Sequence, residues 1–163
     1  MSKIGILSDT HGFLPESASD FFANCDEIWH AGDIGSLSVL NSLRSIAQVR
    51  AVYGNIDGQD IRSVTKNYLA FNCSGKKILI KHIGGRPNAY TAETLEQIKK
   101  EQPDIFVCGH SHILLIQYNK IHNLLHINPG AAGKYGFHKS MTMIRFEISG
   151  DNIKNMEIWE KPK

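Results

Sequence analysis

Short apolar runs alternate with amphipathic segments over the first third of the chain. Apolar runs at 4–7, 27–30 and 48–53 predict buried strands. Between them, apolar residues recur at helical spacing and predict helices over 15–22 and 36–47. The order strand, helix, strand, helix, strand is typical of a parallel sheet with crossover helices. The first part of the chain is therefore predicted to be α/β.

The rest of the chain is richer in strands. A helix is predicted over 91–100 and ends before Pro103. The predicted strands lie at 67–72, 76–82, 104–108, 113–118, 121–127, 141–148 and 152–159, with loops at 84–87, 128–130 and 133–136. An α/β half followed by a β-rich half predicts two sheets packed face to face, with helices outside.

Composition narrows the class of protein. The chain has 163 residues, 42% of them hydrophobic and 21% charged, which is typical of one soluble domain, here expected over 1–163. The net charge is only +2 and no run of Lys and Arg occurs, so no nucleic-acid or membrane surface is expected. Three cysteines without CxxC spacing exclude a disulfide framework or a zinc ribbon. The four apolar residues at 4–7 are too few for a signal peptide, and we expect a cytoplasmic protein.

Candidate chemistry is concentrated where predicted strands end. Five such ends carry oxygen or nitrogen ligands, four of them beside a glycine: Asp9-Thr10-His11-Gly12, Gly32-Asp33, Gly54-Asn55, His82, and Gly109-His110-Ser111-His112. Open α/β sheets bind ligands beyond the carboxyl ends of their strands. If the backbone is still extended, residues two apart share one side, so Asp9 would converge with His11, and His110 with His112.

Each of these blocks alone has an ordinary structural explanation. Asp33 is a suitable helix cap, Asn55 a suitable turn residue, and a lone His82 a hydrogen-bonding histidine. Asp9 and His11 are polar residues in a turn after a strand. Five separate explanations would be needed for seven groups that fall in one predicted layer. Two metal ions about 3.5 to 4 Å apart, bridged by one carboxylate and a water, would use all of them.

The five blocks, in this order, resemble those of the calcineurin-like metallophosphoesterase superfamily, specifically its small bacterial and archaeal phosphodiesterase branch. The resemblance runs from Ile4 to about Phe146 and includes the Asn128-Pro129-Gly130 turn after the last histidine pair. It implies a four-layer α/β/β/α sandwich, in which two face-to-face mixed β-sheets are flanked by helices.

The resemblance also implies an activity, which is hydrolysis of a small phosphate ester, with a diester favoured over a monoester. A hydroxide bridging two divalent ions would attack phosphorus in line with the leaving oxygen. One ion would be held by Asp9, His11, Asp33 and His112, and the other by Asp33, Asn55, His82 and His110. Asp33, Asn55 and His82 would also take part in catalysis. Manganese is the first choice of metal, with iron, nickel or zinc as alternatives.

One position departs from the wider superfamily. Many members have a His directly after the Asn, and this chain has Ile56 followed by Asp57. The phosphodiesterase branch commonly lacks that His too. Without it, general acid assistance of roughly 10²–10⁴-fold is missing unless Asp57 or another group substitutes, which favours esters with good leaving groups.

Arg86 is the predicted ligand of the substrate phosphate. Lys134 and His138 are weaker candidates for the same role, whereas His30, His122 and His126 are expected within strands as structural residues.

Two other function classes are alternatives to the enzyme. A catalytically weak or inactive protein-binding scaffold, like the retromer subunit of this fold, stays open because of Ile56. A P-loop protein is excluded, since 130–134 lacks the leading Gly at 128 and a Ser or Thr after the Lys. The natural substrate is not determined by the sequence, and self-association is left open.

Overall fold

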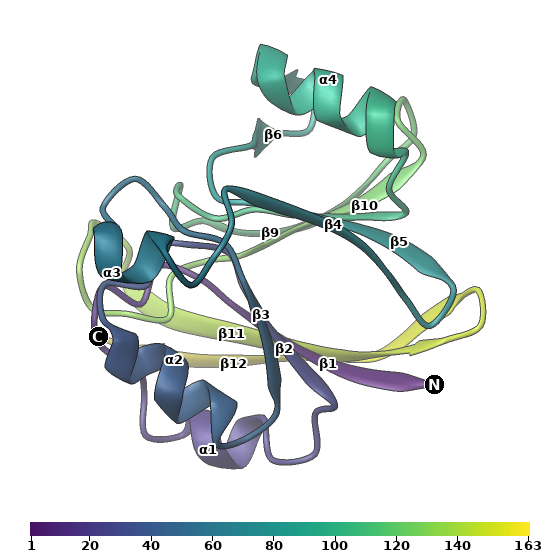
Figure 1. Ribbon diagram of the computed structural model, residues 1–163. Coiled ribbons are helices and arrows are strands. Elements are labelled where there is room, and N and C mark those ends of the chain that lie inside the picture. Colours follow the sequence, from purple (N-terminus) through teal and green to yellow (C-terminus); the bar gives the residue numbers. More distant parts are fainter.

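The computed structural model describes residues 1–163 and contains two five-stranded sheets that face each other (Figure 1). The strand order is β12-β11-β1-β2-β3 in the first sheet and β4-β5-β8-β10-β9 in the second. The strands of the first sheet are β1 (Ser2–Leu7), β2 (Glu27–His30), β3 (Gln48–Ala51), β11 (Ser140–Ser149) and β12 (Asn152–Pro162). Those of the second are β4 (Tyr68–Cys73), β5 (Lys76–Lys81), β8 (Ile105–Val107), β9 (Leu114–Asn119) and β10 (Leu124–Pro129). Both sheets are mixed, as predicted.

Parallel pairing brings the carboxyl ends of the central strands to one edge of each sheet. In the first sheet, Leu7 pairs with His30 and His30 with Ala51, so β1, β2 and β3 end side by side. In the second sheet, β5, β8 and β10 are parallel and end together in the same way. All five ligand-bearing blocks therefore leave the sheets at strand ends of this kind.

The main core lies between the two sheets. Alternate residues of β1, Ile4 and Ile6, are fully buried there with Ile80 and Val107 of the opposite sheet. Gly5 points to the outer face, where a Cβ would lie 2.5 Å from the ring of Phe22. Gly5 therefore allows α1 to pack closely on the first sheet.

Helices cover the outer faces, which confirms the four-layer sandwich (Figure 1). The first sheet carries α1 (Ala18–Phe21) and α2 (Leu37–Arg44), and the second carries α4 (Ala92–Glu101). The short helix α3 (Gln59–Arg62) lies at one end of the sandwich, and its Ile61 joins the apolar cluster outside the first sheet. Side chains cap the two longer helices, since Ser36 Oγ accepts from the Ser38 N–H and Thr91 Oγ1 from the Thr94 N–H. None of these helices has the length and apolar character needed to cross a membrane.

Short elements differ from the prediction. The helix expected over 15–22 is reduced to α1, and α3 was not predicted because only Ile61 of its four residues is buried. The predicted loop at 84–87 contains half of a small hairpin, β6 (Gly85–Arg86) with β7 (Ala89–Tyr90). Residues 121–123 form a turn, so His122 lies outside the strands, and β10 continues through Pro129, where a turn was expected.

Candidate metal centre

The loops after β1 and β2 are joined by backbone hydrogen bonds. Asp9 N–H donates to Gly32 O over 2.9 Å, and His11 N–H donates to Asp33 O over 3.0 Å. Asp9, His11 and Asp33 all have left-handed backbone conformations, with φ of 53°, 45° and 53°. The extended backbone that was expected to align Asp9 with His11 is therefore wrong. The pairing of the two loops brings the side chains together instead.

His30 lies beneath these two loops and is fully buried. Thr10 Oγ1 donates to Ile34 O, so His30 Nε2–H donates to Thr10 Oγ1 over 2.9 Å. The Gly32 N–H donates to His30 Nδ1 over 3.1 Å. Burial lowers the pKa of His30 to about 4 although the nearby carboxylates oppose this, and the neutral ring that results suits both bonds. The expected structural role of His30 agrees with this arrangement.

The loop after β3 is held by Asp57. Its buried carboxylate accepts from the N–H groups of Ile34, Gly35 and Gly54 over 3.1, 2.8 and 2.8 Å. Three backbone donors occupy this carboxylate. Asp57 therefore orders two loops and does not replace the general acid that is missing at position 56. The Ile56 N–H donates to Asp33 Oδ1 over 3.1 Å, while the Ile56 side chain is 45% exposed.

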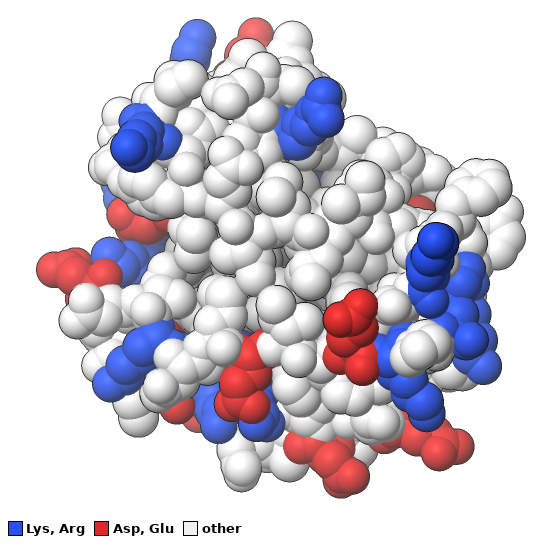
Figure 2. Space-filling model, turned by 180° about the vertical axis from the view of Figure 1, so that it is seen from behind, with Lys and Arg blue, Asp and Glu red and all other residues white.

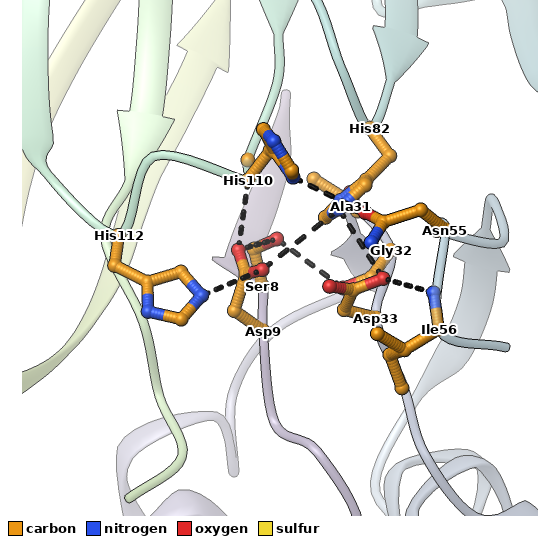
Figure 3. Close-up of polar contacts among 12 residues, drawn as sticks. Ser8, Asp9, Ala31, Gly32, Asp33, Asn55, Ile56, His82, His110 and His112 are labelled. Atoms are coloured by element: carbon orange, nitrogen blue, oxygen red, sulfur yellow. Dashed lines mark hydrogen bonds and ion pairs between the residues drawn. The ribbon is translucent and has the colours of Figure 1, made fainter. Parts of the chain in front are cut away.

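The second sheet contributes three histidines (Figure 3). His82 Nδ1 donates to Ala31 O over 2.8 Å, which turns Nε2 toward Asp33 Oδ1 at 3.2 Å and Asn55 Oδ1 at 3.1 Å. His110 Nδ1 also lies 3.1 Å from Asn55 Oδ1, but His112 Nε2 lies 3.1 Å from Asp9 Oδ1. His110 and His112 have φ of 70° and 59°, so they do not share one side of an extended segment as expected. They reach different partners.

The side chains form two groups that could each hold a metal ion. The ligand atoms of each group lie within 4.8 Å of one another, and the groups are Asp9, His11 and His112, and Asp33, His82 and His110. Asp33 faces both, because Oδ2 lies 3.5 Å from His11 Nε2 and Oδ1 lies 3.2 Å from His82 Nε2. The structure thus brings together all seven predicted ligands, with Asn55 between His82 and His110.

The His11 ring shows that these residues suit a cation. His11 Nε2 is buried and has no hydrogen-bond partner. Leaving such an atom unsatisfied costs about 1–3 kcal/mol, which a coordinated ion would offset. Burial raises the pKa of Asp33, but the hydrogen bonds from His82 and Ile56 together with the charges of His82 and His11 outweigh it, and the net shift is downward. The Asp33 carboxylate is therefore ionised, which is the form that binds a metal.

The sequence pattern of a calcineurin-like phosphoesterase superfamily domain matches residues 2–151. The chain belongs to this superfamily. A Methanocaldococcus jannaschii protein named "Probable metallophosphoesterase" is 33% identical over 134 residues, or 78% of this chain and 67% of the relative. A phosphodiesterase of the same organism is 30% identical over 150 residues, or 82% of this chain and 86% of the relative. These relatives confirm the small archaeal phosphodiesterase branch.

Solved structures of other proteins agree with the fold. A novel archaeal phosphodiesterase superposes with a TM-score of 0.76 at 26% identity, covering 96% of this chain and 99% of its own. Vps29 of Entamoeba histolytica, crystallised in complex with zinc, has a TM-score of 0.76 at 16% identity and covers 98% of each chain. At that identity Vps29 shows the fold alone. Family and site together indicate a metallophosphoesterase.

In this candidate metal centre, further side chains orient the candidate ligands, a role that the sequence pattern did not indicate. Ser8 Oγ donates to Asp9 Oδ2 over 2.7 Å, and the His110 N–H donates to the same oxygen over 3.1 Å, which leaves Oδ1 facing His112. Asn128 Nδ2 donates to Gly109 O and to Ser111 Oγ, each over 3.0 Å. For Asn128, the available signal was the Asn128-Pro129-Gly130 turn, which is part of the resemblance to the superfamily.

The three candidates for contact with the substrate phosphate lie in different places. Arg86 lines a cavity together with His110, so it lies beside the candidate metal centre. Lys134 Nζ lies 4.5 Å from the ring centroid of Phe13 and lines a groove that contains none of the seven ligands. His138 Nδ1 lies 3.2 Å from His112 Nδ1, behind a ligand rather than in front of it.

Proposed function

We propose that the protein is a metal-dependent phosphodiesterase that hydrolyses a small phosphate ester with two divalent ions. The observation that carries this proposal is the Asp33 carboxylate between two His/Asp groups, beside the unpartnered His11 Nε2. The family and the phosphodiesterase relative support hydrolysis of a phosphate ester rather than another metal-dependent reaction.

Each half of the site would hold one ion. Asp9, His11, His112 and Asp33 Oδ2 would bind the first, and Asp33 Oδ1, Asn55, His82 and His110 would bind the second. Such a pair supplies a hydroxide nucleophile at neutral pH and neutralises charge on the phosphate. Nitrogen and oxygen ligands without thiolate suit manganese, our first choice, and also iron, nickel or zinc.

The protein's own groups orient the substrate. Asn55 Oδ1 lies between the His82 and His110 rings, so its Nδ2 is available to donate to a phosphate oxygen. Arg86 would bind the same phosphate or its neighbouring ester oxygen. Arg86 is exposed and is absent from every ion pair of the structure, so its five N–H donors are available.

The charge on one face of the molecule agrees with a small substrate. The face in Figure 2 mixes acidic with basic side chains, and a broad area across its middle carries neither. A nucleic-acid substrate would need a continuous basic surface to neutralise its backbone.

The deciding experiment is turnover of bis(p-nitrophenyl) phosphate by protein stripped with a chelator and reloaded with manganese, iron, nickel or zinc. We expect turnover that requires a divalent ion and exceeds that of p-nitrophenyl phosphate. Asp33→Ala removes the carboxylate that both groups share and should abolish turnover, whereas Asp20→Ala, on the exposed side of α1, should not. Normal turnover by Asp33→Ala would refute the two-metal assignment.

A protein-binding scaffold is the second candidate. Large apolar side chains are exposed on the loop that passes the site, with Tyr135 72% exposed and Phe137 fully exposed. The Tyr135 ring lies 5.0 Å from the His11 ring, so a partner bound there would cover the site. Absence of bound metal and of turnover with every divalent ion would favour this function over the enzyme.

A further inference from the structure

We propose that a cavity beside His110 binds an aromatic or large apolar group of the phosphate ester. This inference rests on the phosphodiesterase function proposed above and adds the chemical class of the substrate. The cavity has a volume of about 430 Å³ and lies between the segment 83–91 and residues 109–115, which run from the loop after β8 into β9. Cavities that bind small molecules in proteins usually measure about 300–1,000 Å³.

The cavity is continuous with the metal centre through His110. His110 lines the cavity, and its Nδ1 lies 3.1 Å from Asn55 Oδ1 inside the cluster. Ser111 and Asn128 line it as well, and the hydrogen bond between them fixes the loop that carries His110. A phosphate held at the centre therefore has this space next to one of its ester oxygens.

The walls are suited to an apolar group. Ile83, Ala89, Ile113 and Leu115 line the cavity, and Arg86 is its one permanently charged side chain. Ile113 is 67% exposed and Ile83 is 39% exposed, so a bound group would remove large apolar surfaces from water. One guanidinium beside apolar walls suits a single phosphate joined to a hydrocarbon or aromatic group, and not a polyanion.

A second cavity, on the other side of Ile83, differs in chemistry. It measures about 290 Å³ and reaches Asn55 and His82, but Arg62, Asn67 and Lys81 line it. Lys81 Nζ is paired there with Glu93 Oε2 at 2.9 Å. This polar cavity is a poor site for an aromatic group, which assigns that group to the cavity beside His110.

The test measures binding of phenylphosphonate and methylphosphonate to the metal-loaded protein by isothermal titration calorimetry. Each ligand has one organic group. The protein's preference for one ligand over the other therefore measures how well the cavity binds that group, and no turnover is needed. Burying a phenyl ring in place of a methyl group should improve binding about tenfold. Ile113→Asn makes one wall polar, and Ala89→Phe fills space from β7. Each substitution should bring the ratio of the phenylphosphonate and methylphosphonate affinities close to one.

Ile121→Asn is the matched control, because Ile121 is similarly exposed but lies in the turn between β9 and β10 and lines neither of these cavities. Metal content is measured for every variant, since Ile113 adjoins His112. If Ile113→Asn loses metal, the result for Ala89→Phe decides the test. Equal binding of both ligands by the unchanged protein would overturn the proposal, and so would a preference that survives Ala89→Phe.

Turnover of bis(p-nitrophenyl) phosphate separates this inference from the proposed function. Turnover without a preference for phenylphosphonate refutes the cavity and leaves the enzyme intact. A preference that Ala89→Phe removes, in a protein without turnover under any divalent ion, supports the cavity as a ligand site and refutes the enzyme.

Discussion

His138 is expected to strengthen one metal site of the pair and not the other. His138 Nε2–H donates to Gly133 O over 2.7 Å, so its Nδ1 carries a lone pair. That lone pair faces His112 Nδ1 at 3.2 Å, which therefore donates the hydrogen bond. Burial lowers the pKa of His138, in keeping with a neutral ring. The His112 tautomer that results has an unprotonated Nε2, which points at Asp9 and is ready for a cation.

The size of the effect follows from this one contact. His138→Leu removes the acceptor for His112 Nδ1–H, and a net hydrogen bond contributes about 0.5–1.5 kcal/mol. Mutating the residue that hydrogen-bonds to a metal ligand typically lowers metal affinity by about 10–100-fold. We expect about tenfold weaker binding at the site of Asp9, His11 and His112, where the two ranges meet. The site of Asp33, His82 and His110 should keep its affinity.

The assay is calorimetric titration of manganese into chelator-stripped protein, which resolves two binding steps when the sites differ. His138→Asn is the matched variant, because Asn Oδ1 can replace Nδ1 as the acceptor and should recover most of the affinity. Equal weakening of both steps would indicate general loosening of the fold. Full affinity in His138→Leu would refute the role of His138 in orienting His112.

Three further results are expected. Gly54→Ala should lose metal at both sites, because its Cβ would overlap Asp33 Oδ1. Gly58→Ala is the control, because a Cβ at this position of the same loop has room, and metal analysis of both variants checks the prediction. Asn128→Ala frees the loop of His110 and His112, so both calorimetric binding steps should weaken, in contrast to His138→Leu. Burial lowers the pKa of His126 to about 4, so below a pH of about 6.5 protonation of this residue favours the unfolded chain, and His126 alone should lower stability by up to roughly 3 kcal/mol as the pH approaches about 4, in addition to the loss from His30. Urea unfolding at several pH values should show a smaller loss for His126→Asn than for the unchanged protein.

The proximity of the seven candidate ligands could be predicted because it depends on strand ends rather than on local conformation. Parallel strands place their carboxyl ends at one edge, so residue type and position after Leu7, His30 and Lys81 were sufficient. The expectation that residues two apart share one side of an extended backbone was wrong for Asp9 and His11 and for His110 and His112. Asp9 converges with Asp33 through a backbone bond to Gly32, and a left-handed turn of this kind has no periodic signal.

The role of Asp57 depends on contacts that a sequence pattern does not contain. Its donors Ile34 and Gly35 are 23 and 22 residues away, and the sheet brings them together only after β2 pairs with β3. In the sequence, Asp57 was an acidic residue next to the site and a reasonable substitute acid. The same limit applies to β6, β7 and α3, which are too short to show a periodic pattern.

Ile56 and the cavity beside His110 agree with the same proposed class of substrate by independent routes. Ile56 occupies the position where many superfamily members have a histidine, and its backbone N–H, not its side chain, contacts the cluster at Asp33. A leaving alcohol would therefore gain no proton from this position, which matters least when the leaving oxygen is weakly basic. Aryl oxides are weakly basic, and aryl groups are the groups that suit the apolar walls formed by Ile83 and Ile113. An aryl phosphodiester thus requires neither a proton donor at Ile56 nor a polar cavity beside His110. Turnover should therefore decline both as the leaving alcohol becomes more basic and as it becomes less aromatic.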